Sequence, residues 1–174
     1  ILIEYKDHLP ILIKHNCFKL LTSSLSQIQK YYDQIKLHDG YDFLNNHRKA
    51  IEDHKQNQFP NCGDTLIFTL RESLLLLVKS NRELALNYIE LFLDSGLTLL
   101  ERIGVYVLSR VTSEPPSDKF SRLMSSQLDK NKYELHHEIF NFIKALYKNL
   151  SLTEQEQWLN EINKYEPKIK KVTN

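Results

Sequence analysis

The hydrophobic residues of this chain recur mainly at alternating steps of three and four, which is the spacing of one face of an α-helix. The clearest run lies between Pro10 and Leu37. Its apolar stripe consists of Phe18, Leu21, Leu25, Ile28, Tyr32 and Ile35. Pro10 suits a first helical turn, where its missing N–H leaves no partner unpaired, and Asp39-Gly40 suits a helix end. The pattern therefore predicts a long amphipathic helix over residues 10–37.

The same periodicity predicts six further helices joined by short connections. They are expected over about 65–79, 82–94, 97–111, 117–129, 132–148 and 151–165. Ser151-Leu152-Thr153-Glu154 has the spacing of a capping box, and Asp64 is the expected N-cap of the helix that follows it. The helix over 65–79 is apolar on nearly every face, so we expect it to be the most buried. Gly104 within a helix predicts the close approach of a neighbouring helix.

Residues 41–63 follow no such pattern. Within them, Pro, Gly and Asn gather over residues 56–63, which is typical of a loop. We expect Tyr41, Phe43 and Leu44 to anchor this connection to the helices.

The composition supports a helical fold. Four Gly and five Pro are few turn formers for 174 residues, whereas the many Leu favour helices. We therefore predict an all-α domain that spans residues 1–174, with seven to eight antiparallel helices in an irregular HEAT-like α-solenoid. A closed helical bundle is the alternative. Because the sequence begins without Met, we expect it to be a fragment of a longer chain.

Charge and hydropathy narrow the classes of function. The chain carries 23 Lys and Arg against 22 Asp and Glu, and this balance removes the usual argument for a nucleic-acid surface. A helical nucleic-acid-binding domain stays an alternative through the basic tail of Lys164, Lys168, Lys170 and Lys171. The longest apolar run, Leu74 to Val78, is far shorter than the roughly 20 residues that cross a bilayer. Two isolated cysteines fit a reducing compartment, so we expect a cytoplasmic protein without a membrane partner.

The sequence lacks the usual motifs of catalysis. HExxH, GxxxxGK[ST], GxGxxG and GxSxG do not occur, so metal, phosphate-loop and serine-hydrolase sites have no signature. His47 and His54 would lie two turns apart on a helix, and the adjacent His136 and His137 diverge, so neither pair is expected to bind a metal ion. We therefore expect no enzyme activity, no cofactor and no metal, and a monomeric isolated chain.

One stretch is more distinctive, namely His47-Arg48-Lys49-Ala50-Ile51-Glu52-Asp53-His54-Lys55-Gln56-Asn57. It is followed by Leu70-Arg71-Glu72, by Leu91-Phe92-Leu93-Asp94-Ser95, and by the run from Glu101 to Leu108. In order and spacing these segments resemble the helical region of large bacterial NACHT/STAND-type ATPases of antiviral defence, over about residues 41–110. The family has a Trp before the first motif, for which Phe43 is the nearest counterpart, and only Arg102 of its later arginine pair is present.

The resemblance implies a helical scaffold between an ATPase and target-sensing repeats. Its function would be protein recognition and signal transmission rather than chemistry. The implied partners are other domains of the same chain and phage proteins. A scaffold domain of another cytosolic protein is the alternative interpretation.

The motif residues also lead to a structural hypothesis. Arg71 lies among apolar helical neighbours and needs a partner, so we expect Glu52 to pair with Arg71 or Arg102. His54 and Asn57 are expected to bond backbone groups of the connection or, alternatively, to form an exposed recognition patch. Arg48 belongs to the same motif, and its role is either structural or in recognition.

Overall fold

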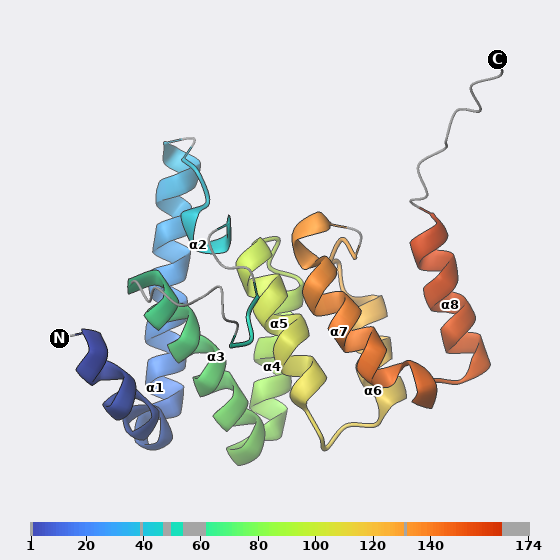
Figure 1. Cartoon of the computed structure of the whole chain (residues 1–174), viewed down its shortest axis with the longest axis horizontal. Helices are drawn as coiled ribbons and strands as arrows, with labels where there is room; N and C mark the ends of the chain where they lie inside the picture. The colour runs from blue at the N-terminus through green and yellow to red at the C-terminus, as the bar shows by residue number, and fades with distance from the viewer. Residues whose placement is uncertain (1, 39, 47–49, 54–61, 131, 165–174) are drawn as a thin grey trace.

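The structure of the chain is a computed structural model that describes residues 2–38, 40–46, 50–53, 62–130 and 132–164. These residues form helices and connections with no strand among them, which confirms the predicted all-α fold (Figure 1). None of the helices that they form is both long and apolar enough to cross a membrane. The helices are α1 (Leu2–Leu37), α2 (Phe43–Asn46), α3 (Cys62–Ser80), α4 (Arg82–Leu93), α5 (Thr98–Arg110), α6 (Pro116–Ser125), η2 (Tyr133–Leu135), α7 (His136–Leu146), η3 (Tyr147–Asn149) and α8 (Leu152–Asn163).

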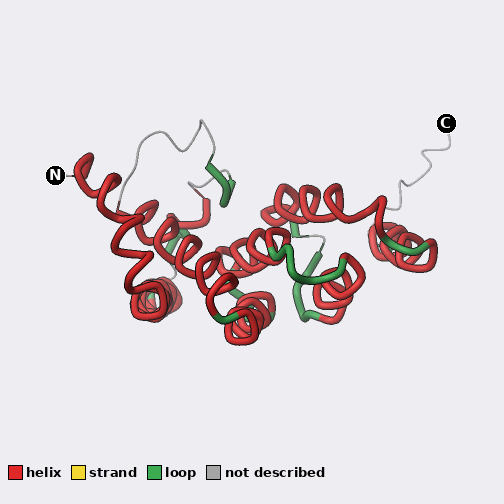
Figure 2. The backbone as a smooth tube through the Cα atoms, turned by 90° about the horizontal axis from the view of Figure 1, so that it is seen from below, coloured by secondary structure: helices red, strands yellow, loops and turns green. Residues whose placement is uncertain are grey.

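The helices follow one another along the long axis of the molecule, from α1 at one end to α8 at the other (Figure 1). α3, α5 and α7 form one layer, in which α5 contacts both of its neighbours. A second layer is formed by α1, α4 and α6 (Figure 2). In it, α1 packs against α3, α4 packs against both α3 and α5, and α6 packs against α5. α5 is therefore central, because helices of both layers cover it.

α1 is longer than the periodicity predicts. It begins at Leu2, so that Pro10 lies in its interior and not in its first turn. Its backbone leaves helical geometry at Asn16, where φ is −135° and ψ is 29°. The helix therefore has two segments that are joined by a kink.

The predicted ends of the other helices are correct in part. Ser151 Oγ accepts a hydrogen bond from the Glu154 N–H, and the Glu154 carboxylate accepts one from the Ser151 N–H, which confirms the capping box. Asp64 lies in the first turn of α3 and does not cap it, because the helix begins earlier, at Cys62. The helix predicted over 132–148 is divided into η2, α7 and η3.

Gly104 brings α5 close to α4. A Cβ atom at this position would lie 3.2 Å from both Phe92 Cβ and Leu93 Cδ2 of α4. This separation is shorter than an ordinary van der Waals contact between carbon atoms. The close approach of a neighbouring helix is thus confirmed.

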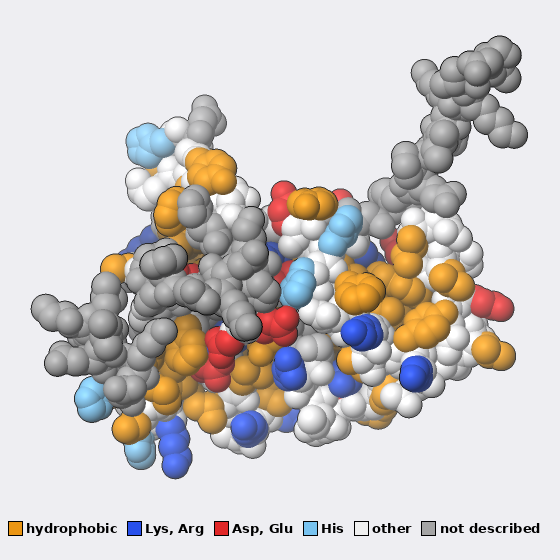
Figure 3. All heavy atoms as spheres, in the orientation of Figure 1, with side chains coloured by type: hydrophobic (Ala, Val, Ile, Leu, Met, Phe, Trp, Pro, Cys, Tyr) orange, Lys and Arg blue, Asp and Glu red, His pale blue; other side chains and the backbone are white. Residues whose placement is uncertain are grey.

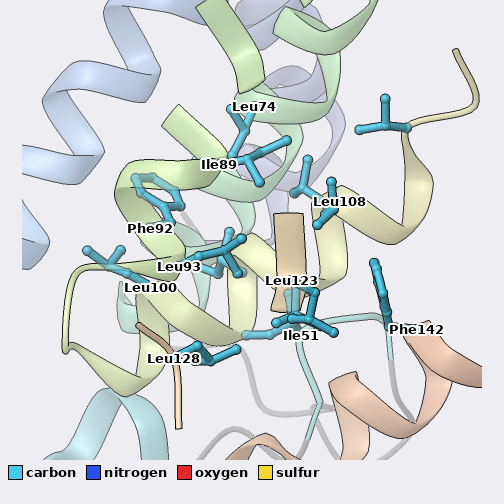
Figure 4. Packing of buried hydrophobic residues seen from close by; sticks show 14 of the residues in the cluster. Ile51, Leu74, Ile89, Phe92, Leu93, Leu100, Leu108, Leu123, Leu128 and Phe142 are labelled. Atoms are coloured by element: carbon cyan, nitrogen blue, oxygen red, sulfur yellow. The ribbon is translucent and has the colours of Figure 1, made fainter. Parts of the chain in front are cut away.

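The buried side chains form one continuous hydrophobic cluster through both layers (Figure 4). α1 contributes four residues of its predicted stripe, namely Leu21, Leu25, Ile28 and Tyr32. Phe18, the first residue of the stripe, is about half exposed, and its ring lies edge-on to that of Tyr88. The most buried helix is α5, and the prediction that 65–79 holds this place was wrong. The reason is position, because α5 lies between α3 and α7 whereas α3 is at one side of the layer.

The expected anchors of the irregular connection are correct in part. Leu44 is partly buried and packs against the core, whereas Tyr41 and Phe43 are exposed. Of the residues that the structure describes in this connection, Asn45, Ala50 and Ile51 are buried. Asn45, a polar residue, is buried because it binds the buried guanidinium of Arg102, as described below.

Replacement of Leu74 by Ala is expected to lower the free energy of unfolding by about 2–5 kcal/mol, because the side chain is fully buried in α3 and its truncation leaves a cavity. Leu152→Ala is the matched control, since it removes the same atoms from a side chain that is 78% exposed. Urea denaturation followed by circular dichroism measures both. A larger loss for Leu152→Ala would contradict this assignment of the core.

Candidate functional site

Residues 50–53, which we call the strap, cross the outer side of the layer formed by α3, α5 and α7 (Figure 2). Ile51 is completely buried and lies among the apolar side chains of the core (Figure 4). Charged side chains bind its backbone on both sides. The Ile51 N–H donates to Glu138 Oε1 of α7 at 3.1 Å, and the Ile51 C=O accepts from Arg71 Nη1 of α3 at 2.6 Å. A buried backbone needs such partners, so these contacts fix the strap between two helices.

Arg102 of α5 and Glu138 of α7 form a buried ion pair beside the strap. Nε and Nη2 of Arg102 donate to the two oxygens of Glu138 at 3.1 and 3.0 Å, and the side chains are only 4% and 2% exposed. Arg102 Nη1 also donates to Asn45 Oδ1 of α2 at 3.0 Å and to the Asn45 C=O at 3.3 Å. Such a two-point contact fixes orientation as well as distance. The pair therefore joins α2, α5, α7 and, through Glu138, the strap.

Arg71 is the second buried arginine of this network, with 2% of its side chain exposed. Besides the Ile51 C=O, it binds Asp53 Oδ1 through Nη2 at 3.1 Å and Glu72 Oε1 through Nε at 2.8 Å. Its guanidinium carbon also lies 5.1 Å from the centre of the Phe68 ring, within the range of a cation–π contact. Two carboxylates therefore compensate the charge of Arg71, that of Glu72 on α3 and that of Asp53 on the strap.

The structure corrects the hypothesis for Glu52. Its carboxylate does not pair with Arg71 or Arg102: Oε1 lies 3.0 Å from His137 Nε2, and Oε2 lies 3.8 Å from the guanidinium of Arg110. The side chain of Glu52 leaves the strap toward α7, while its neighbours provide the contact to Arg71. The acidic partners of Arg71 are instead Asp53 and Glu72, and that of Arg102 is Glu138. Arg48, His54 and Asn57 lie outside the described residues, and their roles stay predictions.

Two surface pockets border this network, and His137 lines both. The first has a volume of about 270 Å³ and is lined by Glu52, Tyr106, Ser109, Arg110, His137, Glu138, Asn141 and Ala145. The second has a volume of about 320 Å³ and is lined by Asn45, Asn46, Arg102, Tyr133, Glu134, His136 and His137. In the first, His137 Nε2 also contacts Asn141 Nδ2 at 3.1 Å, and Arg110 lies over the ring of Tyr106 at 5.3 Å. The first pocket thus places hydrogen-bonding and cationic groups around a carboxylate.

A second ion network lies on the other side of α5. Glu114, in the connection between α5 and α6, has a side chain that is 2% exposed. Its carboxylate accepts from Arg82 Nη2 of α4 and from Arg122 Nε of α6, each at 3.1 Å. Arg122 also pairs with Glu90 of α4. This network therefore joins α4, α6 and the connection between α5 and α6.

Two further buried ionisable groups, Glu101 and Lys130, bind residues of the connection between α6 and η2. Burial raises the pKa of Glu101, an effect that Lys132 opposes with its Nζ 3.4 Å from Glu101 Oε2. Burial likewise lowers the pKa of Lys130, whose ammonium donates to the C=O groups of Ser126 and Leu128.

Sequence reasoning missed Glu138 and His137. The partners of these residues on the strap lie 87 and 85 positions away along the chain, which no local motif reveals. A signal for Glu138 was present, however, because it is one turn before Phe142 on the apolar face of α7. An acidic residue at such a position needs a buried partner.

The arrangement is suited to holding helices together. Each buried acid of the two networks faces an arginine, so its charge is compensated within the protein. Within the described part of the chain, no three His, Cys, Asp or Glu side chains gather as metal ligands.

Comparison with protein-family models, with curated proteins and with solved structures gave no match to this chain. The likeness to the NACHT/STAND helical region therefore rests on the sequence motifs alone. The geometry gives those motifs a physical context, since Ile51, Arg71 and Arg102 lie in one network.

Glu138→Gln is expected to lower the free energy of unfolding by about 3–5 kcal/mol, because it leaves the positive charge of Arg102 buried without its counter-charge. Glu52→Gln makes the same chemical change on the adjacent surface pair, where the expected loss is only about 0–1 kcal/mol. Chemical denaturation of both variants provides the comparison. Equal losses would show that the Arg102–Glu138 pair does not hold the structure together.

Proposed function

We propose that this chain is a non-enzymatic helical scaffold and sensor module of a large bacterial defence ATPase, where it recognises proteins and transmits the signal. The motif resemblance supports the family assignment. The alternative is a scaffold domain of another cytosolic protein, which would have the same fold and the same buried networks but no link to defence.

The observation that carries the proposal is the network around the strap. It joins α2, α3, α5 and α7 through Ile51, Arg71, Arg102 and Glu138. Separating buried charges is costly, so a displacement of one of these helices acts on the others. A module that transmits a signal needs this kind of physical connection between distant parts of its chain.

We further propose that the two layers are an irregular HEAT-like repeat and not a closed bundle. The order of the helices along the long axis and the series α3, α5, α7 support this interpretation. Stacked helices of this kind present an extended face to a partner. A cytoplasmic location is part of the proposal, and the free thiols of Cys17 and Cys62 support it.

The nucleic-acid alternative has less support. The near-zero net charge gives no general attraction to phosphate, and of the basic tail only Lys164 lies among the described residues, where it pairs with Glu161.

The complete gene is expected to encode a GxxxxGK[ST] motif in the same reading frame, because the proposed parent protein is an ATPase. The purified segment 1–174 itself is expected to be monomeric in light scattering and to release no phosphate from ATP. A complete reading frame without the motif, or ATP turnover by the segment, would contradict the proposal.

Asp53→Asn in the full-length protein tests transmission. The side chain of Asp53 is 85% exposed, so the fold should survive while the contact of the strap with Arg71 weakens. We expect basal ATP turnover to stay unchanged and protection of bacteria against phage, measured as plating efficiency, to fall. Asp118→Asn, an equivalent change at an exposed position of α6, is the control. Full protection in the Asp53 variant would contradict a transmitting role for the strap.

A further inference from the structure

The side of α7 that faces solvent carries an unusual combination of groups. Histidine, basic and apolar side chains gather over this helix (Figure 3). Tyr133 and Phe140 are among the most exposed large hydrophobic residues described, and Lys144 Nζ lies 5.9 Å from the centre of the Phe140 ring. Arg110 of α5, which is more than half exposed, lines the pocket beside α7. Aromatic side chains and arginine are enriched where proteins bind one another.

The group that occupies the pocket indicates which ligand chemistry the pocket accepts. The carboxylate of Glu52 sits between His137, at 3.0 Å, and Arg110, at 3.8 Å. All three side chains are at least one third exposed, and an ion pair of this kind contributes little and exchanges readily with solvent and other ions. The carboxylate can therefore leave without disturbing the buried backbone of Ile51. Once it leaves, Arg110, His137 and Asn141 present donors to another acid.

We propose that this face, formed by Arg110, His137, Phe140, Asn141 and Lys144, docks an acidic segment of a partner protein. An Asp or Glu side chain of the partner replaces Glu52 between Arg110 and His137, and an adjacent apolar side chain packs on Phe140. Glu52 is then an internal competitor that occupies the site until the partner arrives. The inference rests on the proposed recognition function and specifies where recognition takes place and which chemistry it uses.

Charge complementarity selects this occupant. Arg110 and Lys144 are exposed cations of this face, and the carboxylate that lies next to Arg110 is that of Glu52, whose place the acid of the partner takes. The exposed acid beside Glu52 on the strap, Asp53, is already paired with Arg71. A partner with both acidic and apolar side chains matches the cations and the aromatic residues together. Among the described residues of this face, a nucleic acid would meet two fixed positive charges, Arg110 and Lys144, with Glu134 nearby, which is few for phosphate binding.

The test uses a fluorescent synthetic peptide with a Glu-Phe-Glu centre flanked by Gly and Ser, titrated in fluorescence anisotropy. Removal of the competitor raises the fraction of open sites, so Glu52→Gln is expected to bind this peptide about two- to fivefold more tightly than the unchanged chain. Arg110→Glu and Phe140→Ala are expected to weaken binding. Lys79→Glu, an exposed change of the same sign at the end of α3, is the control and should leave affinity unchanged.

The comparison ligands separate the possible occupants. A peptide with Gln-Phe-Gln or Lys-Phe-Lys at its centre, and a single-stranded oligouridylate, are expected to bind more weakly than the acidic peptide. Tighter binding of the lysine peptide or of the RNA, or an unchanged or lower affinity of Glu52→Gln for the acidic peptide, would overturn the proposal. Circular dichroism confirms that each variant is folded. If this binding test fails but the complete gene encodes the ATPase motif, the docking site is disproved and the proposed scaffold role is not affected.

Discussion

The ion pair between Arg102 and Glu138 is the interaction on which the arrangement of the helices depends. It joins opposite charges on α5, the central helix, and α7, its neighbour in the same layer. Both charged side chains are buried away from water. The removal of either partner leaves an uncompensated charge in the interior, at a cost of about 3–5 kcal/mol. Because Glu138 also binds the Ile51 N–H, the packing of the helices and the path of the strap are set together.

Two consequences follow for function. The buried charged groups bind one another and hold the helices together. The groups of the proposed docking site, Arg110 and His137, are partly exposed, and Glu52 occupies the space between them. The strap separates these two sets, with the backbone of Ile51 turned inward and the carboxylate of Glu52 turned outward. Adjacent residues of the strap therefore take part in the buried network, through Ile51, and in the proposed docking site, through Glu52.

The sequence was sufficient for the helical fold, for most helix boundaries within a few residues and for the capping box, because these depend on local periodicity and end signals. It also identified Arg71 as a charge that needs a buried partner. The partner was wrongly chosen, because side chains on an irregular connection have no periodicity from which their direction can be read. The burial of α5 and the pairing of Arg102 with Glu138 are long-range properties, which depend on which helices become neighbours.

Amide hydrogen exchange at Ile51 tests the central claim most directly. If Glu138 and Arg71 hold the strap as described, the Ile51 N–H is protected like the amides of α5 and exchanges only when the whole domain unfolds. In Glu138→Gln its exchange becomes faster by a larger factor than that of the amides of α4. Exchange of the Ile51 N–H at the rate of an unprotected peptide in the unchanged chain would contradict the account.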